Sequence, residues 1–345
     1  MKPAATRSLL RSISERDSQT LALPDGRLLG YAEYGHSTGR PILFLHGFPV
    51  SRLEALALDK IARRRRLRVI SPDRPGFGLS TFQPRRRIAD WPADVSALAA
   101  HLKLGRFAIM GTSGGSPYAL ACAHALPRET MSAVGIMGGM GSFDPGTKHI
   151  PMGSWTLGMA SQYWPAGVRI VADALMGAIR WVATTGMVTR WIDGFLEESS
   201  RKKKEAAAAA AVEGSATAEE EPDEAAEEEA QLSTAERRER LLRTLFDGFA
   251  QGAKGMVQEA QLVSQDWGFR LEDVSYDPIL LWHGTKDSNS PIGWVRSMAE
   301  RLPNGVLKEF EGDTHFTIVN HLDKILSDLV PDETSAKSSD GTAAQ

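Results

Sequence analysis

The chain has 345 residues, of which 42% are hydrophobic, and a formal net charge of −3. This length and apolar content suffice for one large core with insertions, and the nearly balanced charge argues against nucleic acid as the main partner. The single cysteine, Cys122, excludes an intrachain disulfide, no residue spacing is typical of a metal site, and no apolar stretch predicts a stable membrane span.

Residues 1–17 are expected to form a mobile leader. They lack a long apolar signal core, and their arginine and serine content is only weakly typical of a mitochondrial presequence. Glu15 and Asp17 argue against import. The sequence therefore favours a cytoplasmic protein, with mitochondrial import as the alternative.

A hairpin is predicted next, from the alternating residues 20–23 and 27–34 on either side of Pro24, Asp25 and Gly26. Apolar strands and helix-like stretches then alternate as far as about residue 137. Such alternation requires a parallel sheet with helices on both faces, so the predicted fold class is α/β.

The most informative segment is Gly-Thr-Ser-Gly-Gly at residues 111–115. It follows the apolar run 107–110 and precedes a helix-like stretch at 117–123. Glycines two places before and two places after Ser113 allow a strand to turn sharply into a helix, and such a turn exposes the serine hydroxyl. Ser113 is therefore the predicted nucleophile.

A later buried strand supplies the acid that a serine nucleophile needs. Residues 278–282 run into a polar loop that ends at Asp287, and His315 follows in another polar loop before a final helix-like run. Ser113, Asp287 and His315 thus stand in the order serine, acid, histidine, which is the order of one particular fold.

With these motifs the chain resembles the α/β-hydrolase superfamily over residues 18–145 and 265–330. The strand at 41–45 that runs into His-Gly-Phe-Pro, and the strand and glycine-rich loop at 69–78, fit the same family. The resemblance implies an α/β-hydrolase fold: a mostly parallel sheet with helices on both faces and an inserted helical cap. It also implies that the backbone amides of Phe48 and Gly114 form the oxyanion hole.

The chemistry explains the choice of residues. A serine hydroxyl is a weak nucleophile at neutral pH, so His315 is predicted to take its proton as general base. Asp287 is predicted to accept a hydrogen bond from the other ring nitrogen and so fix the tautomer. Some superfamily members take the acid from the loop after the sixth strand, and Asp144 follows such a strand at 133–137, so Asp144 is the alternative acid.

The alternation stops near residue 141, and residues 146–264 are expected to form the cap. Its first half is rich in aromatic and methionine side chains at helical spacing, which pack together and would also roof an apolar pocket. These side chains are Trp155, Met159, Tyr163, Trp164, Trp181, Met187 and Trp191.

A low-complexity insert lies within the cap at about 198–236. It holds three consecutive lysines, six consecutive alanines and a block of eight carboxylates at 219–229. Such a composition cannot bury enough apolar surface to offset chain entropy, so the insert is predicted to be disordered, although the alanine run could be helical. The polar residues 331–345 are expected to form a mobile tail.

The leading functional hypothesis is a serine hydrolase without a cofactor or metal. It would cleave an ester, lactone or thioester of a small apolar substrate through an acyl-enzyme. The alternatives are the same triad acting on a peptide-like or carbon–carbon bond, and a non-catalytic small-molecule binder. Three intact triad positions argue against the binder, and serine at the nucleophile position argues against epoxide hydrolases and haloalkane dehalogenases, whose nucleophile is aspartate.

Overall fold

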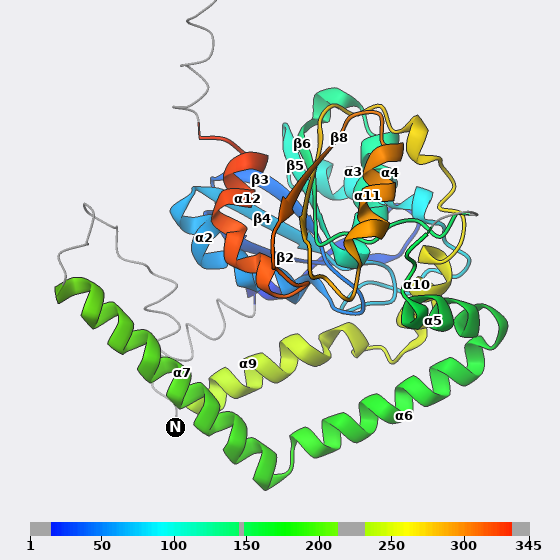
Figure 1. The fold of residues 1–345 in the computed structure, drawn as a ribbon. Helices are drawn as coiled ribbons and strands as arrows, with labels where there is room; N and C mark the ends of the chain where they lie inside the picture. The colour runs from blue at the N-terminus through cyan, green and yellow to red at the C-terminus, as the bar shows by residue number, and fades with distance from the viewer. Residues whose placement is uncertain (1–14, 145–147, 213–231, 333–345) are drawn as a thin grey trace, which may run out of the picture.

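The computed structural model describes residues 15–144, 148–212 and 232–332, and for residues 203–212 it describes the backbone alone. The described residues contain one eight-stranded sheet, in the order β1-β2-β4-β3-β5-β6-β7-β8 (Figure 1). Its strands are β1 (Gln19–Ala22), β2 (Leu28–Gly35), β3 (Arg40–Leu45), β4 (Leu67–Pro72), β5 (Phe107–Thr112), β6 (Met131–Met137), β7 (Ile279–Gly284) and β8 (Gly305–Phe310).

The sheet is mostly parallel. β2 pairs antiparallel with β1 and with β4, and the other neighbouring strands are parallel. The predicted N-terminal hairpin is therefore present, and the predicted α/β fold class is confirmed. The parallel strands read as continuous apolar runs because both faces of the sheet are covered.

The two faces of the sheet carry separate hydrophobic clusters. In β5, Phe107 and Ile109 belong to one cluster, and Ala108 and Met110 belong to the other, because successive side chains of a strand point to opposite faces. The helices that pack on the first face are α3 (Trp91–His101), α4 (Ser116–Ala125) and α11 (Ile292–Arg301). Those that pack on the second face are α2 (Asp59–Arg64) and α12 (Leu322–Leu329).

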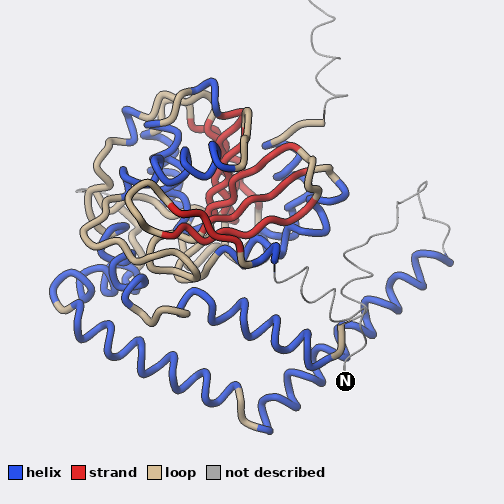
Figure 2. The backbone as a smooth tube through the Cα atoms, turned by 180° about the vertical axis from the view of Figure 1, so that it is seen from behind, coloured by secondary structure: helices blue, strands red, loops and turns tan. Residues whose placement is uncertain are grey.

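Between β6 and β7 the chain forms the inserted helical region. Its described helices are α5 (Met152–Tyr163), α6 (Pro165–Ala183), α7 (Gly186–Val212), α9 (Thr234–Phe246) and α10 (Lys254–Val263). In Figures 1 and 2, α6, α7 and α9 extend away from the sheet, while α5 and α10 lie against it. None of the described helices is long and apolar enough to cross a membrane.

The low-complexity insert begins and ends in helix. α7 continues through the alanine run to Val212, as the high helix propensity of alanine favours. α9 begins at Thr234, where Ser233 and Glu236 cap each other's backbone amides. The start of the predicted insert also packs, since Arg237 of α9 donates a hydrogen bond to Ser200 at 2.5 Å. Residues 213–231, which include the acidic block, lie outside the described residues.

The predicted leader is anchored at its end. Asp17 is buried, and its backbone carbonyl accepts a hydrogen bond from Nε of Arg52 at 2.6 Å. The expectation of mobility is therefore wrong for Asp17, and residues 1–14 lie outside the described residues. At the other end Arg40 donates hydrogen bonds to the Pro331 carbonyl and to Asp332, and residues 333–345 lie outside the described residues.

Candidate active site

Ser113 lies on a sharp turn between β5 and α4. A single 3-10 turn, Ser113–Gly115, separates the two elements, and Ser113 has a φ of +47°. L-residues rarely adopt this left-handed conformation. The turn fits because its flanking residues are glycines: a Cβ on Gly111 would come within 2.8 Å of the Ala119 Cβ, and one on Gly115 would collide with the Leu45 carbonyl.

Asp287 and His315 meet beyond the ends of β7 and β8. His315 Nδ1 lies 2.7 Å from Asp287 Oδ2. The other carboxylate oxygen of Asp287 accepts hydrogen bonds from the backbone amides of Asn289 and Ser290, each at 2.8 Å. Burial raises the pKa of Asp287, but the hydrogen bonds from His315 and Ser290 outweigh it and hold this pKa below its ordinary value. The carboxylate is thus fixed in place and ionised at neutral pH.

His283 supports the acid from behind. Its Nε2 lies 2.7 Å from the Ser290 carbonyl and 3.4 Å from Asp287 Oδ2. Burial lowers the pKa of His283, so the ring is neutral and donates Nε2–H to the carbonyl. The hydrogen bond from His283 therefore stabilises the loop whose Ser290 amide binds Asp287.

Asp144, the alternative acid, has different partners. Its Oδ2 lies 2.7 Å from Nη1 of Arg301 and 3.0 Å from the Ser142 hydroxyl. In the described part of the chain, the carboxylate that contacts His315 is that of Asp287. The geometry therefore favours Asp287 as the acid.

The two segments predicted to hold an oxyanion lie side by side. A Cβ on Gly114 would fall 2.6 Å from the Phe48 Cβ and 3.2 Å from the Phe48 nitrogen, so only glycine allows this close approach. Phe48, Gly114, Ser113 and His315 all line one cavity.

A buried ionic network holds the loop that contains Phe48. Arg74 donates hydrogen bonds to the carbonyls of His46 and Gly47, the latter at 2.9 Å, and its Nε lies 2.6 Å from Glu259 of α10. Glu259 also pairs with Arg86, and all three charged side chains are buried. Burial raises the pKa of Glu259, but Arg74 and Arg86 outweigh it and keep this pKa below its ordinary value.

Glu54 is a cavity residue that sequence reasoning missed. Its Oε2 accepts hydrogen bonds from the Gly47 amide at 2.6 Å and from the Thr112 hydroxyl at 3.3 Å. Burial raises the pKa of Glu54 despite these two hydrogen bonds and the nearby Arg74. A single glutamate seven positions after Gly47 carries no motif, so only the fold brings it to the site.

The cavity has a volume of about 830 Å³, and its lining is mostly apolar. The core contributes Phe48, Val50, Met137, Met140, Phe143, Trp294, Phe316, Ile318 and Val319. The helical region contributes Pro151, Gly153, Ser154, Leu157, Ala260 and Val263. The seven aromatic and methionine side chains expected to roof the pocket are not among the described lining residues, and six of them are exposed to solvent.

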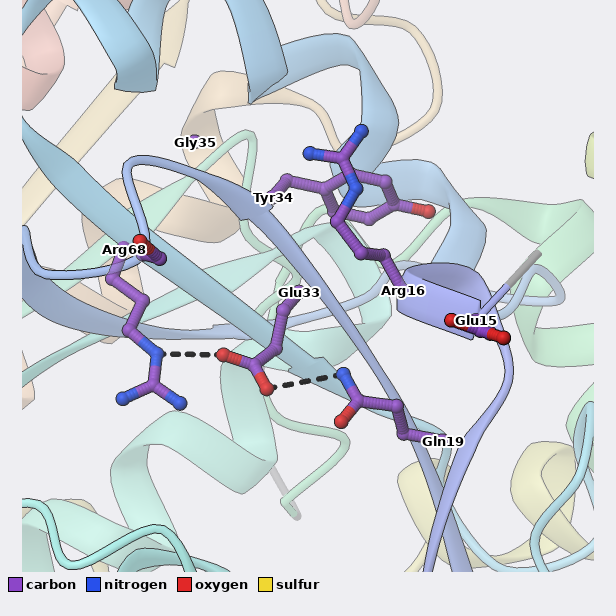
Figure 3. Close-up of a pocket in the computed structure, with 8 residues that line it drawn as sticks. Glu15, Arg16, Gln19, Glu33, Tyr34, Gly35 and Arg68 are labelled. Atoms are coloured by element: carbon purple, nitrogen blue, oxygen red, sulfur yellow. Dashed lines mark hydrogen bonds and ion pairs between the residues drawn. The ribbon is translucent and has the colours of Figure 1, made fainter. Parts of the chain in front are cut away.

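A smaller hollow of about 390 Å³ lies at the β1–β2 edge of the sheet (Figure 3). Its polar side chains bind one another: Glu33 accepts hydrogen bonds from Arg68 at 2.6 Å and from Gln19 at 3.0 Å (Figure 3). None of the residues predicted to carry chemistry lines it. Within the described residues, no group of three or more His, Cys, Asp or Glu side chains could hold a metal ion.

Residues 40–322 match the family described as alpha/beta hydrolase fold. A proline iminopeptidase from Xylella fastidiosa is 30% identical over 136 residues, which are 37% of this chain and 42% of that protein. The chain thus spans less than half the length of the curated relatives that it matches.

Solved structures with low sequence identity share the fold. A bromoperoxidase from Bacillus anthracis is 19% identical with a TM-score of 0.56, over 91% of this chain and all of that one. An esterase from Rhodococcus is 21% identical with a TM-score of 0.53, over 94% of this chain and 99% of that one. By the extent of the family match and by its fold, this chain belongs to the α/β-hydrolase family.

Proposed function

We propose that the chain is a serine hydrolase that cleaves a carboxylic ester, lactone or thioester of a small apolar substrate. Ser113 is the nucleophile, His315 the general base and Asp287 the acid that orients it. The observation that carries the proposal is the 2.7 Å contact between His315 Nδ1 and Asp287, beside a cavity that Ser113 and His315 both line.

The reaction proceeds in two halves. Ser113 Oγ attacks the carbonyl carbon while Nε2 of His315 takes its proton, and the oxyanion accepts hydrogen bonds from the amides of Phe48 and Gly114. The carbonyl re-forms, and the leaving alcohol or thiol takes the proton from Nε2. Water then attacks the acyl-serine with His315 again as base, and the acid product and free Ser113 are released.

The apolar lining supports an uncharged acyl group as substrate. Burial of apolar atoms against such a wall contributes roughly 25 cal/mol per Å². A second candidate is release of an N-terminal residue, because the Xylella relative is a proline iminopeptidase. The carboxylate of Glu54 in the cavity favours this candidate, since it would pair with a substrate ammonium group.

A fluorophosphonate probe tests the nucleophile. We expect one covalent adduct, on the peptide that contains Ser113, and no adduct on Ser113→Ala. An adduct on any other serine would contradict the assignment.

Matched substrates then separate the two candidates. We expect p-nitrophenyl butyrate to be hydrolysed faster than prolyl p-nitroanilide, and Glu54→Gln to leave the butyrate rate near that of the unchanged protein. The opposite order of the two substrates would favour the peptidase, most clearly if Glu54→Gln raised the KM for the prolyl substrate alone.

A further inference from the structure

The described chain exposes an unusually apolar surface on its helical region. Of the 19 large hydrophobic side chains that are exposed, 13 lie between residues 152 and 195. Monomeric proteins rarely expose apolar patches beyond a few hundred Å², and larger ones mark contact with a protein or a membrane. Nine of the 13 lie on α6 and α7, which stand away from the sheet in Figures 1 and 2.

Helix α6 has two apolar faces. The inner face packs Val168, Ala172 and Met176 onto a small cluster around Phe249. On the other side of the helix, apolar residues recur at helical spacing, and five of the seven are large side chains exposed by 45–71%. This outer face consists of Ile170, Val171, Ala174, Leu175, Ala178, Trp181 and Val182.

The charged side chains of α6 turn away from the outer face. Asp173 accepts a hydrogen bond from the Ala253 amide at 2.6 Å. Arg180 donates to the carbonyls of Phe246 and Phe249 at 3.0 and 3.1 Å. These contacts are with the end of α9 and the segment that follows it, on the inner side. The third charged residue, Arg169, is exposed and lies 3.4 Å from Asp173.

Helix α7 carries a second exposed apolar stripe. Met187, Trp191 and Phe195 are spaced by four residues, and each is exposed by 60% or more. The rings of Trp191 and Phe195 stack with their centroids 6.2 Å apart. This stripe therefore adds two exposed aromatic side chains to the apolar surface of the helical region.

We propose that the outer face of α6, extended by the α7 stripe, binds the same surface of a second copy of this chain to form a two-fold dimer. Covering the three aromatic and five large aliphatic side chains would bury on the order of 800 Å² per partner, about the area of a stable, specific interface. The area thus matches what a dimer requires.

The middle of the face suits a helix–helix contact. Ala174, Gly177 and Ala178 are small, which lets two helix backbones approach closely. In a two-fold interface a residue near the axis meets its own copy, so Ala174 and Ala178 would face their counterparts, with Trp181 packing beyond them.

The charges favour a protein over a lipid surface as the partner. Helices that bind membranes carry unpaired Lys and Arg beside their apolar face, which attract anionic headgroups. Here Arg169 lies 3.4 Å from Asp173, and Arg238 of α9 pairs with Asp193 of α7. Arg190 is an exposed cation beside Trp191 of the stripe. The segment joining α7 to α9 carries eight carboxylates at 219–229, which anionic lipid would repel.

Sedimentation or light scattering tests the full chain at roughly 10 µM, a concentration above the micromolar Kd of a weak interface of this size. We expect a mass twice the 37.5 kDa of one chain. Ala178→Glu should give a folded monomer with unchanged ester turnover, because it places a charge in the interface and touches no cavity residue. Its melting temperature should fall only by the contribution of the lost dimer contact. Val306→Glu, at an exposed apolar position on β8, is the matched control and should remain dimeric.

A cross-link tests the same contact without a destabilising charge. The native thiol, Cys122, is buried, so Ala174→Cys places the reactive thiol on the outer face. Mild oxidation should convert most of Ala174→Cys, but not Val306→Cys, into a disulfide-linked pair.

Two results would overturn the proposal. The first is a wild-type chain that stays monomeric at this concentration. If that monomer floats with phosphatidylcholine–phosphatidylserine vesicles, the face binds lipid instead. The second is a dimer that survives Ala178→Glu and gives no cross-link through Ala174→Cys, because its interface would then lie elsewhere.

Discussion

Asp287 and Asp144 both follow strands at the carboxyl edge of the sheet, but their neighbours give them different chemistry. Asp287 contacts His315, whereas Asp144 pairs with Arg301. We expect Asp287→Asn to lower kcat by about 10⁴, because an amide would stabilise the wrong tautomer of the histidine. Asp144→Asn is the matched control and should stay near wild type. Steady-state kinetics on a small ester measures kcat for both variants. A larger loss in Asp144→Asn than in Asp287→Asn would assign the role of the acid to Asp144.

The carboxylate of Glu54 accepts a hydrogen bond from the Gly47 amide. Two variants separate the effect of this hydrogen bond from the effect of the charge. Glu54→Gln keeps an acceptor for the Gly47 amide, so we expect kcat within a few-fold of wild type. Glu54→Ala removes the acceptor and frees the loop that carries Phe48, so kcat should fall by about 10-fold or more with little change in KM. Equal losses in both variants would assign the effect to charge instead.

Ser113 and Asp287 could be predicted from sequence because each follows a buried strand. His315 could be predicted because the order serine, acid, histidine is specific to one fold. The site contacts of Glu54, Arg74 and Glu259 could not be predicted from the sequence. Arg74 and Glu259 are 185 positions apart, and their contact depends on where α10 docks against the loop after β4. Pairing of buried charges is a tertiary property that no local pattern encodes.

At the scale of elements, the parallel strands were predictable because continuous apolar runs of five or six residues indicate strands covered on both faces. The cap helices show the limit of such patterns. Periodicity correctly predicted apolar faces, but it does not say what covers them, and the aromatics expected over the cavity instead face solvent. The pocket is lined by smaller cap residues such as Ser154 and Leu157.

Through Glu259 and Arg74, helix α10 joins the inserted helical region to the loop that contains Phe48. We expect Glu259→Gln to reduce the free energy of unfolding by about 3–5 kcal/mol, because it leaves two buried arginines without a full counter-charge. Its kcat should fall as well, since Arg74 holds the carbonyls of His46 and Gly47. Denaturant unfolding measures the first effect and ester kinetics the second.

The control for this prediction is a surface pair. Asp332→Asn breaks the contact with Arg40, which is partly exposed, and should leave the unfolding midpoint near wild type. A Glu259→Gln variant as stable as Asp332→Asn would show that the buried network contributes little.

At the scale of the whole molecule, the proposed catalytic residues follow three strands: Ser113 lies in the turn after β5, and Asp287 and His315 lie in the loops after β7 and β8. Residues 213–231 join the end of α7 to the start of α9 in the sequence, and none of the proposed catalytic residues is among them. Replacing it with a short Gly/Ser linker should leave the melting temperature within a few degrees of wild type and small-ester turnover unchanged. Each doubling of a flexible loop changes its closure cost by only about 0.6 kcal/mol. A linker variant that melts normally but loses turnover would assign the acidic block a role in catalysis.

Helix α10 touches three parts of the molecule at once. Met256 and Val257 pack on the inner face of α6, Ala260 lines the cavity, and Glu259 holds the arginine behind the oxyanion loop. The proposed subunit association on one side of α6 and the proposed acylation at Ser113 would therefore both act on α10. Thermodynamic linkage requires reciprocity: if occupying the active site tightens the dimer by some factor, dimerisation tightens binding at the active site by the same factor. Comparing the dimer Kd of the free chain with that of the phosphonylated chain would measure this factor, and equal values would show that the two sites are independent.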